Sequence, residues 1–221
     1  MRMLYITEIS AVRYSAVSRE ILTLKNTSAG GVSLHRGPKG MFKLKKTKRA
    51  RALAISAVIA AMYAVLTYVA AAMSLAFGPV QFRFSEALTV LPVFTPAAIP
   101  GLAIGCLISN LASPLGIVDW VFGTTATLCA AVCTYGLRNV CVKKVPLLAP
   151  LPPVVFNALL VGFEIACLSE SGTFSLANLS FAGFLYGALS VGIGELVVCY
   201  VLGLPLLSAL RRTKIEEKLH L

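Results

Sequence analysis

The chain has 221 residues, of which 57% are hydrophobic and only 13% are charged, and its mean hydropathy is +0.83. Because an ordinary soluble domain is about 25% charged, this composition excludes a water-soluble fold and predicts an all-α, polytopic integral membrane protein. Of the 20 Lys and Arg residues, 12 lie at or before Arg51 and four lie at or after Arg211. The net charge of +11 is therefore concentrated near the ends, where it is typical of cytoplasmic membrane flanks and not of a nucleic-acid-binding surface.

Residues 1–40 are mixed polar, contain several glycines, and lack the apolar core of a signal peptide. They predict a disordered extension, or a start codon placed upstream of the true one, because Met41 begins a basic stretch typical of a membrane-protein start. A regulatory tail is the alternative interpretation. The membrane domain is predicted over 41–213, and residues 214–221 are predicted to form a cytoplasmic tail.

Six apolar segments follow one another along the chain. A bilayer core of about 30 Å needs about 20 apolar residues per helix. The first segment is long enough by itself, whereas Pro96 divides the next apolar stretch into two shorter pieces. The fifth segment carries three prolines in its first turns. The predicted spans are 51–73, 84–95, 97–112, 117–137, 147–168 and 180–210.

The distribution of basic residues predicts how these spans are oriented. Six crossings place both termini and the linker 138–146 in the cytoplasm, and that linker carries three basic residues. The predicted outer linkers are 74–83, 112–116 and 169–179, and together they contain one basic residue, Arg83. This pattern obeys the positive-inside rule and indicates a multi-pass cell-membrane protein with both termini inside. The alternative is five spans, with 84–112 as one bent helix, which would place either that linker or the C-terminus outside.

Small residues form a stripe along the first span. They recur every four residues, with a parallel pair beside them, and small-xxx-small surfaces let membrane helices approach closely. The stripe predicts contact with another helix, either in a partner subunit or within the same bundle. Its members are Ala52, Ser56, Ala60 and Ala64, with Ala57 and Ala61 as the parallel pair.

Charged side chains within the spans are the main functional candidates, because each costs at least about 2.5–3.5 kcal/mol on insertion scales. Arg83 and Glu86 are three residues apart and predict either an intrahelical ion pair at the outer surface or a ligand-contacting pair. Asp119 and Trp120 follow an outer linker. The indole is expected either in an interfacial belt or stacked on a planar ligand. In the second case, Asp119 would accept hydrogen bonds from the N–H groups of that ligand.

Two later spans carry acids without any Lys or Arg to neutralise them. Asn157 and Glu164 are seven residues apart and so lie near one helical face. Glu195 lies mid-way along the last span in Gly-Ile-Gly-Glu-Leu, where the glycines permit close helix approach. We therefore favour a functional role for both glutamates. The predicted substrate-binding residues are Arg83, Glu86, Asn110, Asp119, Trp120, Asn157, Glu164 and Glu195.

Recognised catalytic motifs are missing from the sequence. His35 and His220 lie outside the spans, and the chain has no His-Glu-x-x-His, Gly-x-Ser-x-Gly or phosphate-loop pattern. The six cysteines fall in or beside apolar segments and are interpreted as small buried residues. We therefore predict no enzymatic activity, and no metal or cofactor in this chain.

Several strings resemble the QueT family over about residues 50–212. The longest is Gln-Phe-Arg-Phe-Ser-Glu-Ala-Leu-Thr-Val-Leu-Pro at 81–92, which continues to Gly-Cys-Leu-Ile-Ser-Asn at 105–110. Gly-Glu-Leu at 194–196 and Leu-Gly-Leu-Pro at 202–205 also match. The resemblance implies the substrate-binding S component of an energy-coupling factor (ECF) uptake system, built as a six-helix bundle.

The same resemblance implies partners and a substrate. The S component would dock on a transmembrane T subunit through an Ala-x-x-x-Ala motif in its first helix, and two partner ATPase subunits would use the ATP. The implied substrates are the 7-deazaguanines preQ0, preQ1 and queuine, whose rings need aromatic stacking, carboxylates and amides. The alternatives are an S component for another vitamin-like molecule, a stand-alone secondary transporter with Glu164 and Glu195 as proton relays, and an integral membrane enzyme.

Overall fold

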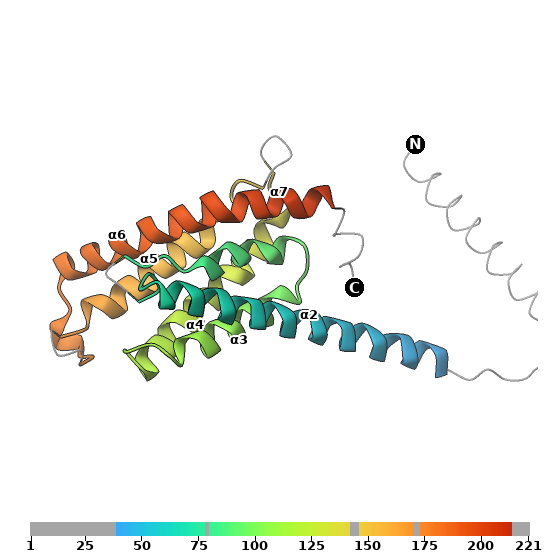
Figure 1. The fold of residues 1–221 in the computed structure, drawn as a ribbon, viewed down its shortest axis with the longest axis horizontal. Coiled ribbons are helices and arrows are strands. Elements are labelled where there is room, and N and C mark those ends of the chain that lie inside the picture. The colour runs from blue at the N-terminus through green and yellow to red at the C-terminus, as the bar shows by residue number, and fades with distance from the viewer. Residues whose placement is uncertain (1–38, 78–79, 142–145, 170–172, 214–221) are drawn as a thin grey trace, which may run out of the picture. The chain divides into compact units, whose positions relative to one another are not determined.

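A computed structural model describes residues 39–77, 80–141, 146–169 and 173–213. The chain divides into two units, Met1–Leu44 and Lys45–Leu221, and Figure 1 shows the helices of the second. The regular elements in the described ranges are all helical, which confirms the predicted all-α class. The main helices are α2 (Lys39–Ala72), η1 (Phe84–Val93), α3 (Ala98–Asn110), α4 (Ile117–Gly136), α5 (Leu151–Ala166), α6 (Phe181–Val197) and α7 (Leu204–Arg212).

Three stretches of helix are long and apolar enough to cross a membrane, namely Lys48–Ala72, Ile117–Asn139 and Phe181–Arg212. The shorter apolar helices are η1, α3 and α5. This set agrees with a six-helix membrane protein. The predicted N-terminal extension falls outside the described residues apart from the first two residues of α2, and the predicted C-terminal tail lies wholly outside them.

The helix η1 is a 3-10 helix that returns alongside α2 in the opposite direction. Thr67 Oγ1 donates to Ser85 Oγ at 2.7 Å, and further along η1, Leu88 joins the same hydrophobic cluster as the earlier α2 residue Ile59. A 3-10 run of 10 residues is unusually long. It is tolerated at membrane depth because nearly all of its residues are buried in protein and none of its backbone needs to face lipid.

After Pro96 the chain reverses, and α3 runs parallel to α2. Near the start of α3, Ser56 Oγ donates to Ala97 O at 2.7 Å. Near the end of α3, Tyr68 Oη, from further along α2, donates to Ile108 O at 2.9 Å. Two segments that point in opposite directions cannot form one bent span. The two short segments are therefore two separate helices, η1 and α3, and not one bent helix.

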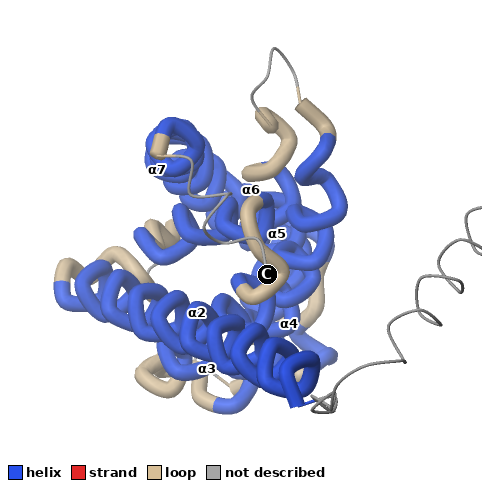
Figure 2. Tube along the Cα trace, turned by 90° about the vertical axis from the view of Figure 1, so that its right-hand side faces the viewer, coloured by secondary structure: helices blue, strands red, loops and turns tan. Residues whose placement is uncertain are grey.

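The remaining helices continue the alternation, with α3 and α4, α4 and α5, and α5 and α6 packed as neighbours (Figures 1 and 2). The rings of Phe122 and Phe163 are 5.9 Å apart and join the start of α4 to the end of α5. At the opposite end, Thr134 Oγ1 donates to Ala149 O at 3.1 Å. At the same end, Phe94, which follows η1, packs in one apolar cluster with Ala149 and with Leu207 of α7.

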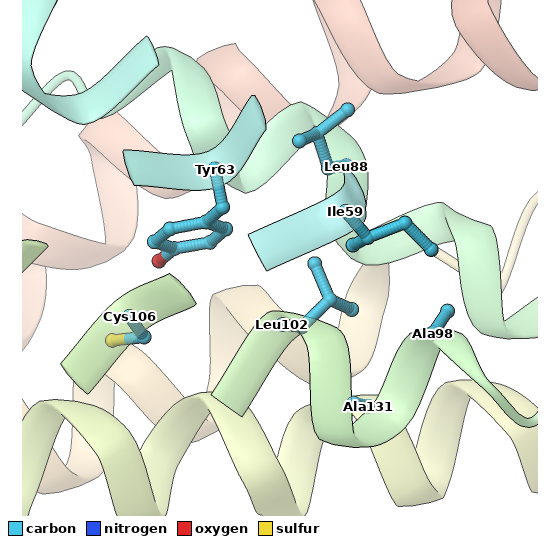
Figure 3. Close-up of a cluster of buried hydrophobic side chains, with 7 residues drawn as sticks. All are labelled: Ile59, Tyr63, Leu88, Ala98, Leu102, Cys106 and Ala131. Atoms are coloured by element: carbon cyan, nitrogen blue, oxygen red, sulfur yellow. The ribbon is translucent and has the colours of Figure 1, made fainter. Parts of the chain in front are cut away.

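The core between α2, η1, α3 and α4 is closely packed, and Figure 3 shows Tyr63 of α2 facing α3 within it. A Cβ added to Gly105 would lie 2.7 Å from the Tyr63 Cβ and 2.9 Å from the Ala60 carbonyl oxygen. Only glycine lets α2 and α3 approach this closely. The buried members of the cluster are Ile59, Tyr63, Leu88, Ala98, Leu102, Cys106 and Ala131.

The last span is not one continuous α-helix. It begins at the N-cap Ser180, whose side chain accepts a hydrogen bond from Gly183 N at 3.1 Å. A π-helical segment, η4 (Val198–Gly203), follows α6 and leads into α7. Such segments are rare and are frequently found at functional sites, and here η4 begins three residues after Glu195.

Candidate functional site

The interior of the bundle contains an unusual group of buried charges. Arg83, Glu86, Asp119, Glu164 and Glu195 each have a relative exposure of 4% or less. They come from η1, α4, α5, α6 and the residue that precedes η1. Buried ionic groups are costly unless they are paired and hydrogen-bonded. Their hydrogen-bond partners therefore indicate which groups serve the fold and which remain available.

Arg83 joins three elements at one end of the bundle. Its Nε donates to Ala76 O at 3.2 Å, and its Nη1 donates to Asn110 Oδ1 at 3.0 Å. Its Nη2 lies 3.5 Å from Asp119 Oδ2, and the guanidinium lies 5.2 Å from the ring centroid of Phe77. The loop after α2, the end of α3 and the start of α4 are thus joined by one side chain.

The expected ion pair between Arg83 and Glu86 is replaced by the pair of Arg83 with Asp119. The reason is local geometry. Arg83 precedes η1 with an extended backbone, φ −90° and ψ 105°, so its side chain is not stacked on the helical turn that carries Glu86. The i, i+3 argument applies only where both residues are inside a helix.

Glu86 faces α2 and α5. It accepts a hydrogen bond from the Tyr63 hydroxyl through Oε1, while its Oε2 has no hydrogen-bond partner among the described residues. The Asn157 side chain lies next to the carboxyl groups of both Glu86 and Glu195. Asn157 therefore brings α5 into contact with acids from two other helices.

Glu195 is linked to the π-helical segment that follows it. Cys199 Sγ lies 3.5 Å from Glu195 Oε2 and 3.7 Å from the carbonyl oxygen of Glu86. The Thr89 hydroxyl is 4.0 Å from the same sulfur. These contacts connect η1 with η4 next to Glu86 and Glu195.

Glu164 differs from the other acids. Its side chain is fully buried, and neither carboxylate oxygen has a hydrogen-bond partner within the described part of the chain. The charged groups close enough to interact with it are Asp119 and Arg83. The prediction that Asn157 and Glu164 share a face is consistent with the burial of both on α5.

A cavity of about 380 Å³ opens beside Asp119, at the end of the bundle where α2, α3 and α5 finish. Its volume falls within the range of small-molecule sites. The lining combines aromatic, polar and apolar side chains, namely Phe77, Gln81, Ser113, Pro114, Leu115, Asp119, Ile165, Leu168 and Tyr186.

The aromatic lining of this cavity differs from the prediction. Trp120 is half-buried on α4 and is not among the lining residues, whereas Phe77 and Tyr186 are. Sequence reasoning also missed Tyr63, although a tyrosine hydroxyl in the middle of an apolar span was a signal that it needed a buried partner. Phe77 and Tyr186 carried no comparable signal in the sequence.

The small-residue stripe of α2 has two parts in the structure. Ser56, Ala60 and Ala64 are buried, and Ser56 and Ala60 pack against α3. Ala52 is half-buried, and the parallel pair Ala57 and Ala61 is exposed. The bundle therefore uses the Ser56, Ala60 and Ala64 face of α2, whereas the Ala57 and Ala61 face is exposed.

Metal binding has no support in the described residues, which contain no group of three or more His, Cys, Asp or Glu side chains that could hold an ion. The free cysteines of this region are distributed over several helices and loops. The polar groups available to a ligand are instead carboxylates, amides and hydroxyls.

Comparison with known proteins decides the family. A family model described as QueT transporter matches residues 53–212, which include every helix from η1 to α7 and most of α2. The chain belongs to the QueT transporter family. Because this is a family of transporters, the prediction that the chain is not an enzyme is confirmed.

A curated relative carries the same family name. The chain is 38% identical over 85 residues to the "Queuosine precursor transporter QueT" of Lactococcus lactis subsp. cremoris (strain MG1363). The alignment covers 38% of this chain and 49% of the relative, so the chain spans about half the length of the curated relative that it matches. No solved structure matches the chain.

Proposed function

We propose that the chain is the substrate-binding S component of an ECF-type uptake transporter that imports a queuosine precursor, a 7-deazaguanine such as preQ1, preQ0 or queuine. The observation that carries this proposal is the group of buried acids and amides inside an apolar bundle of the QueT transporter family. Carboxylates suit the N–H and amino donors of a guanine-like ring, and amides suit its carbonyl group.

The proposed ligand contacts are the predicted site residues, now grouped by the structure. Arg83, Asn110 and Asp119 form one hydrogen-bonded set near the cavity. Glu86, Asn157 and Glu195 form a second set, and Glu164 lies near the first. Trp120 completes the predicted set, although Phe77 and Tyr186 line the cavity and Trp120 does not.

The proposed orientation places the cavity on the outer side of the cell membrane. In the described residues, the loops at that end carry one basic residue, the buried Arg83, whereas Arg138, Arg211 and Arg212 lie toward the opposite end. The positive-inside rule assigns the basic end to the cytoplasm. A ligand would then enter from outside and be released when the subunit acts with the proposed T and ATPase subunits.

Calorimetric titration of the purified subunit tests the substrate class. We expect preQ1, preQ0 or queuine to bind at least tenfold more tightly than guanine, because the groups on the deaza position add contacts that guanine lacks. Equal affinity for guanine and the deazaguanines would defeat the substrate assignment. Uptake that persists without ATP and without co-purifying ATPase subunits would instead favour a secondary transporter.

The exposed alanine pair predicts where the T subunit docks. Replacing Ala57 with leucine should reduce co-purification of the partner subunits and transport at least tenfold, because a larger side chain prevents close approach of a partner helix. Ligand affinity of the isolated subunit should stay within about twofold.

Ala60 provides the matched comparison, because it lies three residues away on the buried face. Leucine at Ala60 should lower the thermal unfolding temperature, since that side chain packs against Gly105. Normal assembly of the Ala57→Leu variant would remove this face from the docking surface.

A further inference from the structure

The buried charges of the site do not balance. Four buried carboxyl groups face a single buried guanidinium among the described residues, so the fully ionised group would have a formal charge of 1 − 4 = −3. A net charge of this size is costly inside a bundle surrounded by lipid. Protonation of carboxyl groups or a bound cation would reduce it.

The hydrogen bonds show where such a cation would be held. Glu86 accepts from Tyr63 through Oε1, although its Oε2 has no hydrogen-bond partner among the described residues, and Glu195 has the Cys199 thiol beside it. The Asn157 side chain lies next to both of these carboxyl groups. Asp119 uses Oδ2 for Arg83, but its Oδ1 has no hydrogen-bond partner in the described structure, and neither does either oxygen of Glu164. Asp119 and Glu164 lie on the packed helices α4 and α5, close in sequence to Phe122 and Phe163, whose ring centroids are 5.9 Å apart.

These atoms match one chemical group. A protonated primary amine carries three N–H donors and one positive charge, and the acid pair has three unused acceptor oxygens. Asp119 lines the cavity, and so does Leu168, which follows Glu164 by four residues just beyond the end of α5. The aromatic rings of Phe77 and Tyr186 line the same cavity and could cover a planar ring system.

We infer that Asp119 and Glu164 form an acidic pair that binds a protonated amine of the ligand, so that the site selects the amine-bearing queuosine precursors over preQ0, which lacks the amine. This inference rests on the proposed function and assigns a role within it. Arg83 is then a positioning residue, because it occupies Oδ2 of Asp119 and leaves Oδ1 without a hydrogen-bond partner among the described residues.

The experiment titrates preQ1 and preQ0 separately into the purified full-length protein and into its Glu164→Gln variant. Wild-type protein should bind preQ1 at least tenfold more tightly than preQ0. The glutamine keeps the shape and removes the negative charge, so preQ1 affinity should fall about ten- to a hundredfold. Affinity for preQ0 should stay within about twofold, which a merely structural role of Glu164 would not produce.

Two further variants keep the result interpretable. Glu195→Gln removes an acid of the second set and should leave the ratio of preQ1 to preQ0 affinity unchanged. Glu170→Gln, in the predicted outer linker and outside the described residues, should change neither affinity. Thermal unfolding of each variant shows that it is folded.

Three outcomes would overturn the inference while leaving the proposed function intact. Equal binding of preQ1 and preQ0 by the wild-type protein would exclude amine selection. An equal loss of both ligands in Glu164→Gln, or a collapse of the affinity ratio in Glu195→Gln alone, would remove Glu164 from the amine site. If no 7-deazaguanine binds at all, the proposed function itself fails.

Discussion

Replacing Arg83 with methionine should destabilise the protein by about 3–5 kcal/mol, because it leaves the buried Asp119 without its cationic partner. The same change removes two hydrogen bonds, to Ala76 O and to Asn110 Oδ1. Methionine retains the apolar stem beside Phe77, so the loss is chiefly electrostatic. Thermal and denaturant unfolding in detergent would measure it.

Variants of Asp119 show how much of this loss comes from the ion pair itself. Asp119→Asn should also destabilise the protein, because it leaves the buried guanidinium without a counter-charge. The double variant with Arg83→Met should be more stable than the sum of the single effects predicts, since it removes both charges together. Strict additivity, or a single Arg83→Met variant as stable as wild type, would show that the ion pair contributes little to the fold.

Alanine at Gly194 should disrupt both stability and ligand binding. A Cβ there would overlap the carbonyl oxygen of Gln81, and backbone atoms cannot move aside as a flexible side chain can. Overpacking typically costs about 1–3 kcal/mol and occasionally more, and we expect the upper end of this range. Gln81 lines the cavity, so ligand affinity should fall at least tenfold.

Gly192 is the matched control, because it lies two residues earlier on the same helix. An added Cβ there would lie 3.4 Å from the Ala158 Cβ, which is ordinary contact. Gly192→Ala should therefore change the unfolding temperature by a few degrees at most. If both variants behave alike in thermal unfolding and in calorimetric titration, the close approach of α6 to Gln81 is not what constrains residue 194.

The number and approximate positions of the helices could be predicted because apolar runs and prolines are local features of the sequence. The 3-10 conformation of η1 could not be predicted from the sequence. Pro92 and the β-branched residues around it weaken the α-helix, but the 3-10 form persists because surrounding helices bury it. The π-helical segment η4 likewise has no local signal, since Val-Cys-Tyr-Val-Leu-Gly differs little from the apolar residues before it.

The buried acids could be found from sequence because a charge within an apolar segment is conspicuous. Their partners could not, because partners are set by the tertiary arrangement. The sequence spacing predicts a pair of Arg83 with the nearest acid, Glu86, whereas the structure pairs Arg83 with Asp119 of another helix. The aromatic lining was missed for a similar reason, since the direction of a side chain at a loop or helix end is not encoded by hydropathy.

The π-helical segment affects how the end of the chain should be compared with its relatives. Each α-helical residue advances by about 100° around the axis, so extra residues in one turn rotate everything that follows. The side chains of α7 therefore point in directions that the 3.6-residue periodicity of α6 does not predict. Leu207 of α7 is completely buried against the end of η1. A relative that lacks this widened turn would need an apolar residue at a different position to fill the same space.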